Sequence, residues 1–73
     1  MKLSGAGKGK YLVISIDSSS GLKEKLLRQG IIPGKEILVV EVRKKGPCVV
    51  QVDDTRMIIG AGMTEKIEVK KHS

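Results

Sequence analysis

The chain has 73 residues, a length that allows one small domain and leaves no room for a separate catalytic lobe. It contains one tyrosine and neither phenylalanine nor tryptophan, so its core must be built from aliphatic side chains. The net charge of +6 is compatible with binding to nucleic acid. However, eight acidic residues are interleaved with the basic ones, and Tyr11 alone cannot supply the aromatic platform that stacks on the bases of single-stranded nucleic acid. We therefore expect no specific nucleic-acid partner.

Membrane insertion and secretion are also not expected. The longest uninterrupted aliphatic or aromatic runs have four residues, whereas a span needs roughly 20. No apolar signal-peptide segment follows Lys2. Cys48 is the single cysteine, so no disulfide can form within the chain. These features are typical of a cytoplasmic protein.

The N-terminal part of the chain predicts a loose segment followed by a strand. Glycines are frequent in residues 1–9, but they precede a strand, whereas a phosphate-binding loop follows one. We interpret 1–9 as a flexible lead-in. Alternation of apolar residues predicts a strand over 11–17, with Leu12, Ile14 and Ile16 facing the core.

An amphipathic helix is expected next. Residues 18–20 are serines, which favour helix N-termini, so the helix should begin at about Ser20. Leu22, Leu26 and Leu27 then form one apolar stripe, with charged side chains around it. The stripe should pack against the core.

The end of this helix is the best-specified local feature. Gly30 fits the left-handed position that follows a helix, and Ile31 would then pack on Leu26. Pro33 and Gly34 supply the fixed φ and the positive φ that a type II turn requires. The chain is therefore expected to turn here into a second strand.

Four further strands are predicted after this turn. They cover residues 35–43, 48–53, 55–59 and 66–69. The first of them is apolar on both faces, which is typical of a central strand. In the next, Cys48, Val50 and Val52 alternate inward, so Cys48 is expected to be a small buried hydrophobic residue. One helical turn at 63–65 should precede the last strand, and residues 70–73 should fray.

Five short strands separated by turn signals predict a mainly β protein. We expect a small barrel of about five strands, with one short amphipathic helix inserted after the first strand. The whole chain, 1–73, should form a single domain.

No arrangement of residues predicts catalysis, a metal site or a cofactor. His72, the only histidine, is close to the C-terminus, where it cannot serve as a rigidly held general base. Asp53 and Asp54 are adjacent, which favours a turn. Cys48 and His72 lack the close spacing of zinc ligands. We predict that the chain is not an enzyme.

Exposed basic side chains are the better candidates for a function, since guanidinium groups bind the carboxylates of protein partners. The candidate partner-binding residues are Lys23, Arg28, Arg43 and Arg56. Free strand edges in a small barrel also favour weak self-association.

Residues 20–34 carry a specific resemblance. In the pattern SGL…LL..GIIPG they combine a cap, a leucine pair, a glycine stop and a Pro-Gly turn in one order. Together with the strands on either side, this pattern resembles the FeoA family, the small accessory proteins of bacterial ferrous iron uptake. The resemblance covers residues 3–70 and implies an SH3-like barrel, shared with the C-terminal domains of iron-dependent repressors.

The resemblance also implies a partner. FeoA proteins are thought to assist the membrane iron permease FeoB, whose cytoplasmic part is a GTPase domain. We therefore expect a cytoplasmic adaptor, peripheral to the inner membrane through its partner, that modulates transport or GTPase activity. The resemblance brings no matched metal ligands. Two alternatives stay open, a basic barrel that binds nucleic acid and a metal-dependent transcription-regulatory module.

Overall fold

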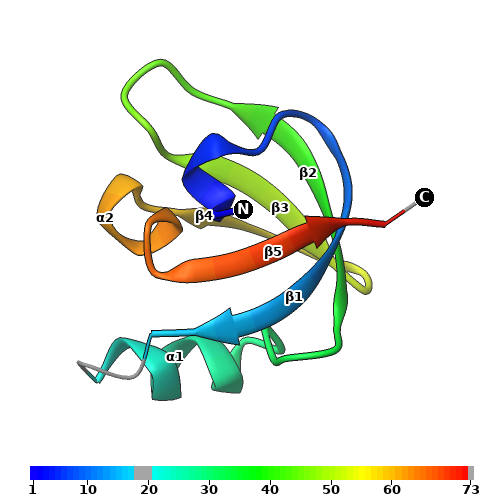
Figure 1. Ribbon diagram of the computed structural model, residues 1–73, viewed down its shortest axis with the longest axis vertical. Helices are drawn as coiled ribbons and strands as arrows, with labels where there is room; N and C mark the ends of the chain where they lie inside the picture. The colour runs from blue at the N-terminus through cyan, green and yellow to red at the C-terminus, as the bar shows by residue number, and fades with distance from the viewer. Residues whose placement is uncertain (18–20, 73) are drawn as a thin grey trace.

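The computed structural model describes residues 1–17 and 21–72, and of Leu22 the backbone only (Figure 1). The strands are β1 (Gly9–Ile16), β2 (Glu36–Val42), β3 (Cys48–Val52), β4 (Thr55–Ile59) and β5 (Ile67–Lys71). The helical segments are η1 (Leu3–Gly5), α1 (Leu22–Arg28) and α2 (Ala61–Thr64).

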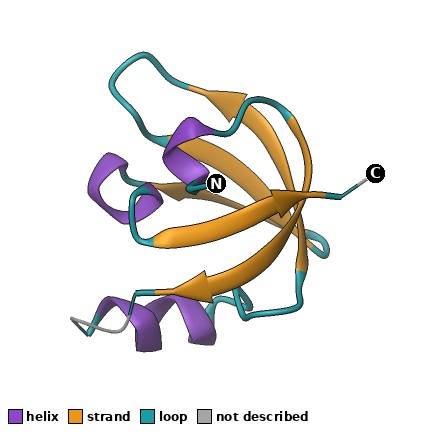
Figure 2. Cartoon of the chain, viewed as in Figure 1, coloured by secondary structure: helices purple, strands orange, loops and turns teal. Residues whose placement is uncertain are grey.

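All of these strands form one antiparallel sheet in the order β4-β3-β2-β1-β5. β2 is the middle strand, which confirms the position that its two apolar faces predicted. The sheet curls around the core, and Figure 2 shows the helical segments at its margins. The architecture is the expected one, a mainly β, SH3-like barrel with one short helix between the first two strands.

The core is almost entirely aliphatic. Inward-facing residues pair across neighbouring strands, as Tyr11 does with Ile37 and Val39 with Val50. The buried hydrophobic residues are Leu3, Ala6, Tyr11, Val13, Ile16, Leu26, Ile31, Ile37, Val39, Cys48, Val50, Val52, Ile59, Ile67 and Val69. Burial of each large side chain stabilises the fold by about 1.5–3 kcal/mol relative to exposure.

β1 presents the opposite face from the expected one. Tyr11 and Val13 are 3% and 1% exposed, whereas Ile14 is 43% exposed and Leu12 is half-buried. A bulge against β5 after Val13 shifts the alternation by one residue and returns Ile16 to the core. The prediction that Leu12 and Ile14 face the core is therefore wrong. The run of apolar residues fits both phases of a strand, and the bulge leaves no mark in the sequence.

The β3–β4 hairpin agrees with its prediction. Cys48, Val50 and Val52 are all buried, so they alternate inward as expected. Asp53, with a φ of 55°, and Asp54 form the connection between the two strands. The turn interpretation of these two aspartates is confirmed.

The end of α1 has the hydrogen bonds of a Schellman motif. The Gly30 N–H donates to the Leu27 carbonyl at 3.1 Å, and the Ile31 N–H donates to the Leu26 carbonyl at 3.0 Å. Gly30 has a φ of +90°, and both Leu26 and Ile31 are fully buried. The predicted glycine stop is confirmed.

The start of α1 is less fully described. Gly21 precedes the helix and supplies no side-chain cap. Ser20, the predicted cap, lies outside the described residues, as does the side chain of Leu22. Of the predicted leucine stripe, Leu26 is in the core as expected, whereas Leu27 is 37% exposed. The expectation that Leu27 packs against the core is wrong, because Leu27 lies about 100° around the helix from Leu26.

The turn into β2 also matches its prediction. The Lys35 N–H donates to the Ile32 carbonyl at 3.0 Å, which closes a β-turn around Pro33 and Gly34. Gly34 has the positive φ, +89°, that a type II turn needs at this position. Its N–H donates to the Val13 carbonyl at 2.8 Å, so the turn is held beside β1.

The first residues are packed, which corrects the interpretation of 1–9 as a flexible lead-in. Leu3 and Ala6 are 2% and 5% exposed, because the η1 turn places both against the core. The Val69 N–H donates to the Met1 carbonyl at 2.7 Å, and Lys2 forms a β-bridge with Glu68. The N-terminal segment thus supplies hydrogen bonds to β5, the last strand of the sheet.

The last residues differ from the expectation in the same way. β5 continues to Lys71, which pairs with Tyr11, and the His72 N–H donates to the Lys10 carbonyl at 3.0 Å. The predicted frayed tail at 70–73 is therefore corrected, because β1 begins early enough to pair with it. Ser73 lies outside the described residues.

Truncation of Leu3 tests the packing of the N-terminal segment. Leu3→Ala should lower the free energy of unfolding by about 2–4 kcal/mol, since it leaves a cavity in the core. Ser4→Ala, at the exposed neighbouring position, should change it by less than about 0.5 kcal/mol. Urea unfolding monitored by circular dichroism measures both. Equal stability of the two variants would mean that the segment is not part of the core.

The left-handed backbone at Gly30 gives a second prediction. Gly30→Ala should cost about 1–2 kcal/mol, since an L side chain is strained at this φ. The matched control is Gly62→Ala in α2, where an added Cβ meets nothing within 4 Å and φ is not positive. This control should be neutral or stabilising by up to about 1 kcal/mol. A Gly30→Ala variant as stable as the control would contradict the assignment.

Candidate partner-binding surface

The side chains considered for catalysis or metal binding are dispersed in the structure. Among residues 1–17 and 21–72, no three His, Cys, Asp or Glu side chains come together in a way that could hold a metal ion. His72 Nε2 lies 3.1 Å from Glu36 Oε2, and Asp53 Oδ2 lies 2.9 Å from Lys35 Nζ. These groups pair as isolated, partly exposed contacts.

Cys48 is buried on β3 and is 3% exposed. Burial raises the pKa of its thiol above the ordinary value of 9.0, because the apolar surroundings disfavour the thiolate. The thiol is therefore neutral at physiological pH. Cys48 serves as a small hydrophobic residue, as the alternation in the sequence predicted.

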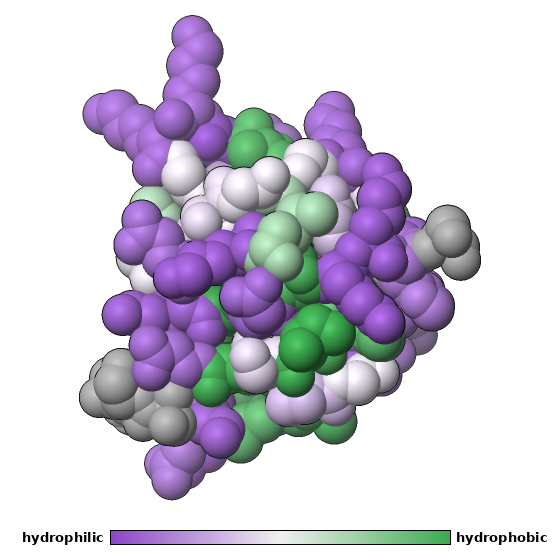
Figure 3. All heavy atoms as spheres, viewed as in Figure 1, coloured by the Kyte–Doolittle hydropathy of each residue, from purple (hydrophilic) through white to green (hydrophobic). Residues whose placement is uncertain are grey.

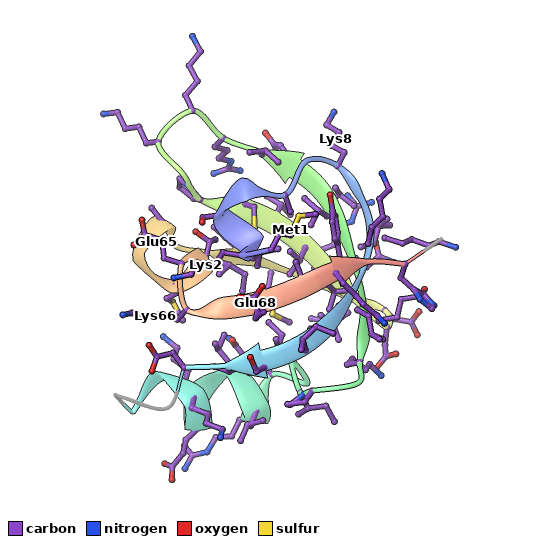
Figure 4. The ribbon with its side chains drawn as sticks, in the orientation of Figure 1. Met1, Lys2, Lys8, Glu65, Lys66 and Glu68 are labelled. Atoms are coloured by element: carbon purple, nitrogen blue, oxygen red, sulfur yellow. The ribbon has the colours of Figure 1, made fainter. Side chains whose placement is uncertain are left out.

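Among the clefts formed by the described residues, two mix both signs of charge. The larger, of about 340 Å³, is lined by Lys10, Gly34, Lys35, Glu36, Ile37, Leu38, Gln51 and Asp53. The smaller, of about 160 Å³, lies beside β5 (Figure 4). There Glu68 Oε2 is 2.7 Å from the Met1 amine, and Lys66 Nζ is 3.8 Å from Asp17 Oδ2. Acids and bases thus alternate in both clefts, and neither favours a ligand of one charge.

Three exposed aliphatic side chains lie on segments that are joined to one another. They are Ile14 on β1, Leu27 on α1 and Ile32 in the turn after α1, which are 43%, 37% and 43% exposed. The Val13 N–H donates to the Lys35 carbonyl at 2.9 Å, and this bond holds the turn against β1. In Figure 3 hydrophobic side chains gather over β1 and α1. We name these three residues the β1–α1 patch.

The four basic residues predicted to bind a partner do not form one surface. Lys23 and Arg28 belong to α1, the helix that carries Leu27 of the β1–α1 patch. Arg43 follows the C-terminal end of β2, whereas the turn after α1 precedes the start of this strand. Arg56 lies on the outer side of β4, where its Nε donates to Gln51 Oε1 at 3.1 Å. Exposed aliphatic residues also adjoin the other two, since Val42 precedes Arg43 and Ile58 follows Arg56 on the same strand.

None of the three members of the β1–α1 patch was recognised as a surface residue in the sequence, since Leu27 too was expected to pack against the core. The sequence placed Ile14 in the core and gave no prediction of whether Ile32 is buried or exposed. The run of four apolar residues from Tyr11 to Ile14 was the signal for Ile14, because alternate members of such a run must face outward.

The FeoA domain family model matches residues 1–71. The chain belongs to the FeoA family. A crystal structure of an iron uptake regulatory protein (FeoA) is 32% identical, with a TM-score of 0.86, and the match covers 96% of this chain and 95% of that one. An iron(II) transport protein A from Clostridium thermocellum is also 32% identical, with a TM-score of 0.86, over 97% of this chain and 45% of that one. No curated protein sequence matches the chain.

Metal-dependent repressors share the fold of this FeoA-family domain. The repressor ScaR with bound Zn²⁺ has a TM-score of 0.89 at 23% identity, and the match covers 99% of this chain and 37% of the repressor. Identity at this level shows the fold alone. In the described part of the chain, no helix is both long enough and apolar enough to cross a bilayer.

The burial of Cys48 predicts its reactivity and its pH dependence. In the folded protein a thiol reagent at pH 8 should modify Cys48 at least about a hundredfold more slowly than in urea, since the reagent reaches the thiol only on opening. The folded pKa is raised, so this group's contribution to stability is constant below about pH 9 and is lost as pH rises further. Stopped-flow labelling with a chromogenic disulfide measures the rate. Equal rates in the folded and unfolded states would contradict the burial.

Proposed function

We propose that this FeoA-family domain is an accessory protein of ferrous iron uptake. In this proposal it binds the cytoplasmic GTPase part of a FeoB-type permease and modulates transport or GTP hydrolysis. The observation that carries the proposal is the family match over residues 1–71, supported by 32% identity to an iron uptake regulatory protein over nearly the whole of both chains. The proposed activity is protein contact rather than chemistry.

The β1–α1 patch is the proposed contact surface. Its residues come from three segments that are joined by hydrogen bonds, because the Schellman motif ends α1 and the turn after it is bonded to Val13. A rigid patch loses little conformational entropy when a partner covers it. Exposed aliphatic side chains on such a surface gain free energy by leaving water, at about 25 cal/mol per Å².

Basic side chains beside the patch define the partner's chemistry. Lys25 and Arg28 lie in the last turn of α1, and Lys23 lies one turn earlier. Charged residues at the rim of an interface steer encounter and exclude wrong partners, while the apolar centre supplies affinity. We therefore expect the partner to present an apolar spot that is bordered by carboxylates.

Regulation through this surface requires a difference in affinity. A domain that binds the GTP-bound and GDP-bound permease equally well shifts neither state. If the domain prefers one nucleotide state by a given factor, its binding raises the permease's relative affinity for that nucleotide by the same factor. In the proposal, the domain therefore binds the permease differently when GTP and when GDP is bound.

Substitution in the patch tests the proposal. Ile14→Thr and Ile32→Thr should each weaken binding to the detergent-solubilised permease by about tenfold, as expected for residues near an interface centre. The matched control is Ile58→Thr, since Ile58 is a 59% exposed isoleucine on β4, away from the patch. Isothermal titration calorimetry with each guanine nucleotide measures the affinities.

Two outcomes would overturn the proposal. One is the absence of binding to the permease in either nucleotide state, together with normal ferrous iron uptake in cells that lack the domain. The other is equal weakening by Ile58→Thr, which would place the contact elsewhere.

Arg28→Glu should reduce the association rate at low salt and have less effect at high salt, because rim charges are screened.

A further inference from the structure

The loop between β2 and β3 carries three consecutive basic residues on a rigid support. Arg43, Lys44 and Lys45 are all exposed. The Arg43 N–H donates to the Pro47 carbonyl at 2.9 Å, and the Gly46 N–H donates to the Arg43 carbonyl at 3.0 Å. Gly46 has a φ of +102°, and a Cβ there would lie 2.8 Å from Ala61 Cβ. The loop is therefore closed on itself and packed against α2. We name residues 43–45 the basic tip.

The charges of the basic tip are largely unneutralised. Within the described residues, Lys44 and Lys45 have no hydrogen-bond or ion-pair partner, and Arg43 Nε is 3.7 Å from Glu41 Oε1 in an exposed pair. Lys8 lies at the same end of the barrel and is also exposed (Figure 4). Arg43, Lys44, Lys45 and Lys8 therefore carry more positive charge than the one carboxylate that pairs with them among the described residues, that of Glu41.

The opposite end of β3 carries acidic and basic side chains together. Asp53 and Asp54 form the turn that follows β3, whereas the basic tip precedes this strand. Asp53 is partly neutralised by Lys35, at 2.9 Å, and Asp54 is exposed. An anionic surface would therefore attract the basic tip more strongly than this turn. The domain should therefore approach such a surface in one orientation.

The side chains at the tip distinguish among anionic surfaces. Tyr11, the only aromatic residue of the chain, is 3% exposed, so no aromatic ring is available to stack on bases. Lysine ammonium groups are compact charges suited to phosphates, and Val42 beside them is an exposed aliphatic side chain at 46%. These features favour lipid headgroups, where phosphate and hydrocarbon lie close together, over a nucleic acid.

We propose that the basic tip binds the anionic surface of a lipid bilayer. Arg43, Lys44, Lys45 and Lys8 contact the headgroup phosphates, while the Asp53–Asp54 turn points away from the membrane. This contact is made by the domain directly and requires no permease. It goes beyond the proposed function, and either can fail without the other.

Vesicle binding tests the proposal with the full chain and no permease. The chain should sediment with vesicles of one third phosphatidylglycerol at low salt and not with pure phosphatidylcholine. Lys44→Gln with Lys45→Gln should lower the partition coefficient roughly twentyfold, since each lysine near an anionic surface contributes about a fivefold factor. The matched control is Lys70→Gln with Lys71→Gln, which removes the same charge from β5 and should retain most of the binding.

Three results would overturn the proposal. The first is no preference for anionic over neutral vesicles. The second is an equal loss in the two double variants, which would show that only net charge matters. The third is tighter binding to duplex DNA than to the anionic vesicles at the same salt concentration, with the same loss in Lys44→Gln with Lys45→Gln, which would assign the tip to nucleic acid. Circular dichroism of each variant confirms that the fold is intact.

Discussion

The left-handed backbone at Gly30 is the constraint on which the rest of the structure depends. It ends α1 after two turns, brings the Ile31 N–H to the Leu26 carbonyl, and directs both side chains into the core. The Pro33–Gly34 turn then bonds to β1 and starts β2, the middle strand of the sheet. The exposed side chains of this connection form most of the β1–α1 patch. One local motif thus fixes both the topology and the proposed contact surface.

The sequence predicted the features that depend on local chemistry. Gly30, Pro33 and Gly34 each provide a backbone conformation that other residues resist, so the helix end and the turn could be assigned without knowledge of the sheet. The inward alternation of Cys48, Val50 and Val52 in β3 could also be predicted from the sequence. These assignments needed no contact between distant residues.

The sequence could not predict what depends on pairing between strands. Tyr11 to Ile14 is apolar throughout, and the bulge that selects its buried phase arises from the register with β5. The two terminal segments looked disordered in the sequence because distant strands hold them in place. The N-terminal segment is hydrogen-bonded to β5, and His72 is hydrogen-bonded to β1. The patch could not be recognised for the same reason, since it combines a misassigned strand residue with side chains from two other segments.

The two proposed surfaces lie toward opposite ends of β2, since the patch adjoins its start and the basic tip follows its end. A domain with its basic tip on the bilayer would therefore present the patch away from the membrane, toward the cytoplasmic part of a permease. Charge would set the orientation, and apolar burial would set the affinity for the partner. Both contacts use exposed side chains, and the core only holds them in place.

The most direct test of the central claim is methyl NMR of the domain with labelled isoleucine and leucine side chains, titrated with the permease's GTPase domain. The account predicts that the methyl signals of Ile14, Leu27 and Ile32 shift or broaden together, while that of Ile58 stays unchanged. Perturbation centred on Ile58, or uniform perturbation of all four residues, would contradict it.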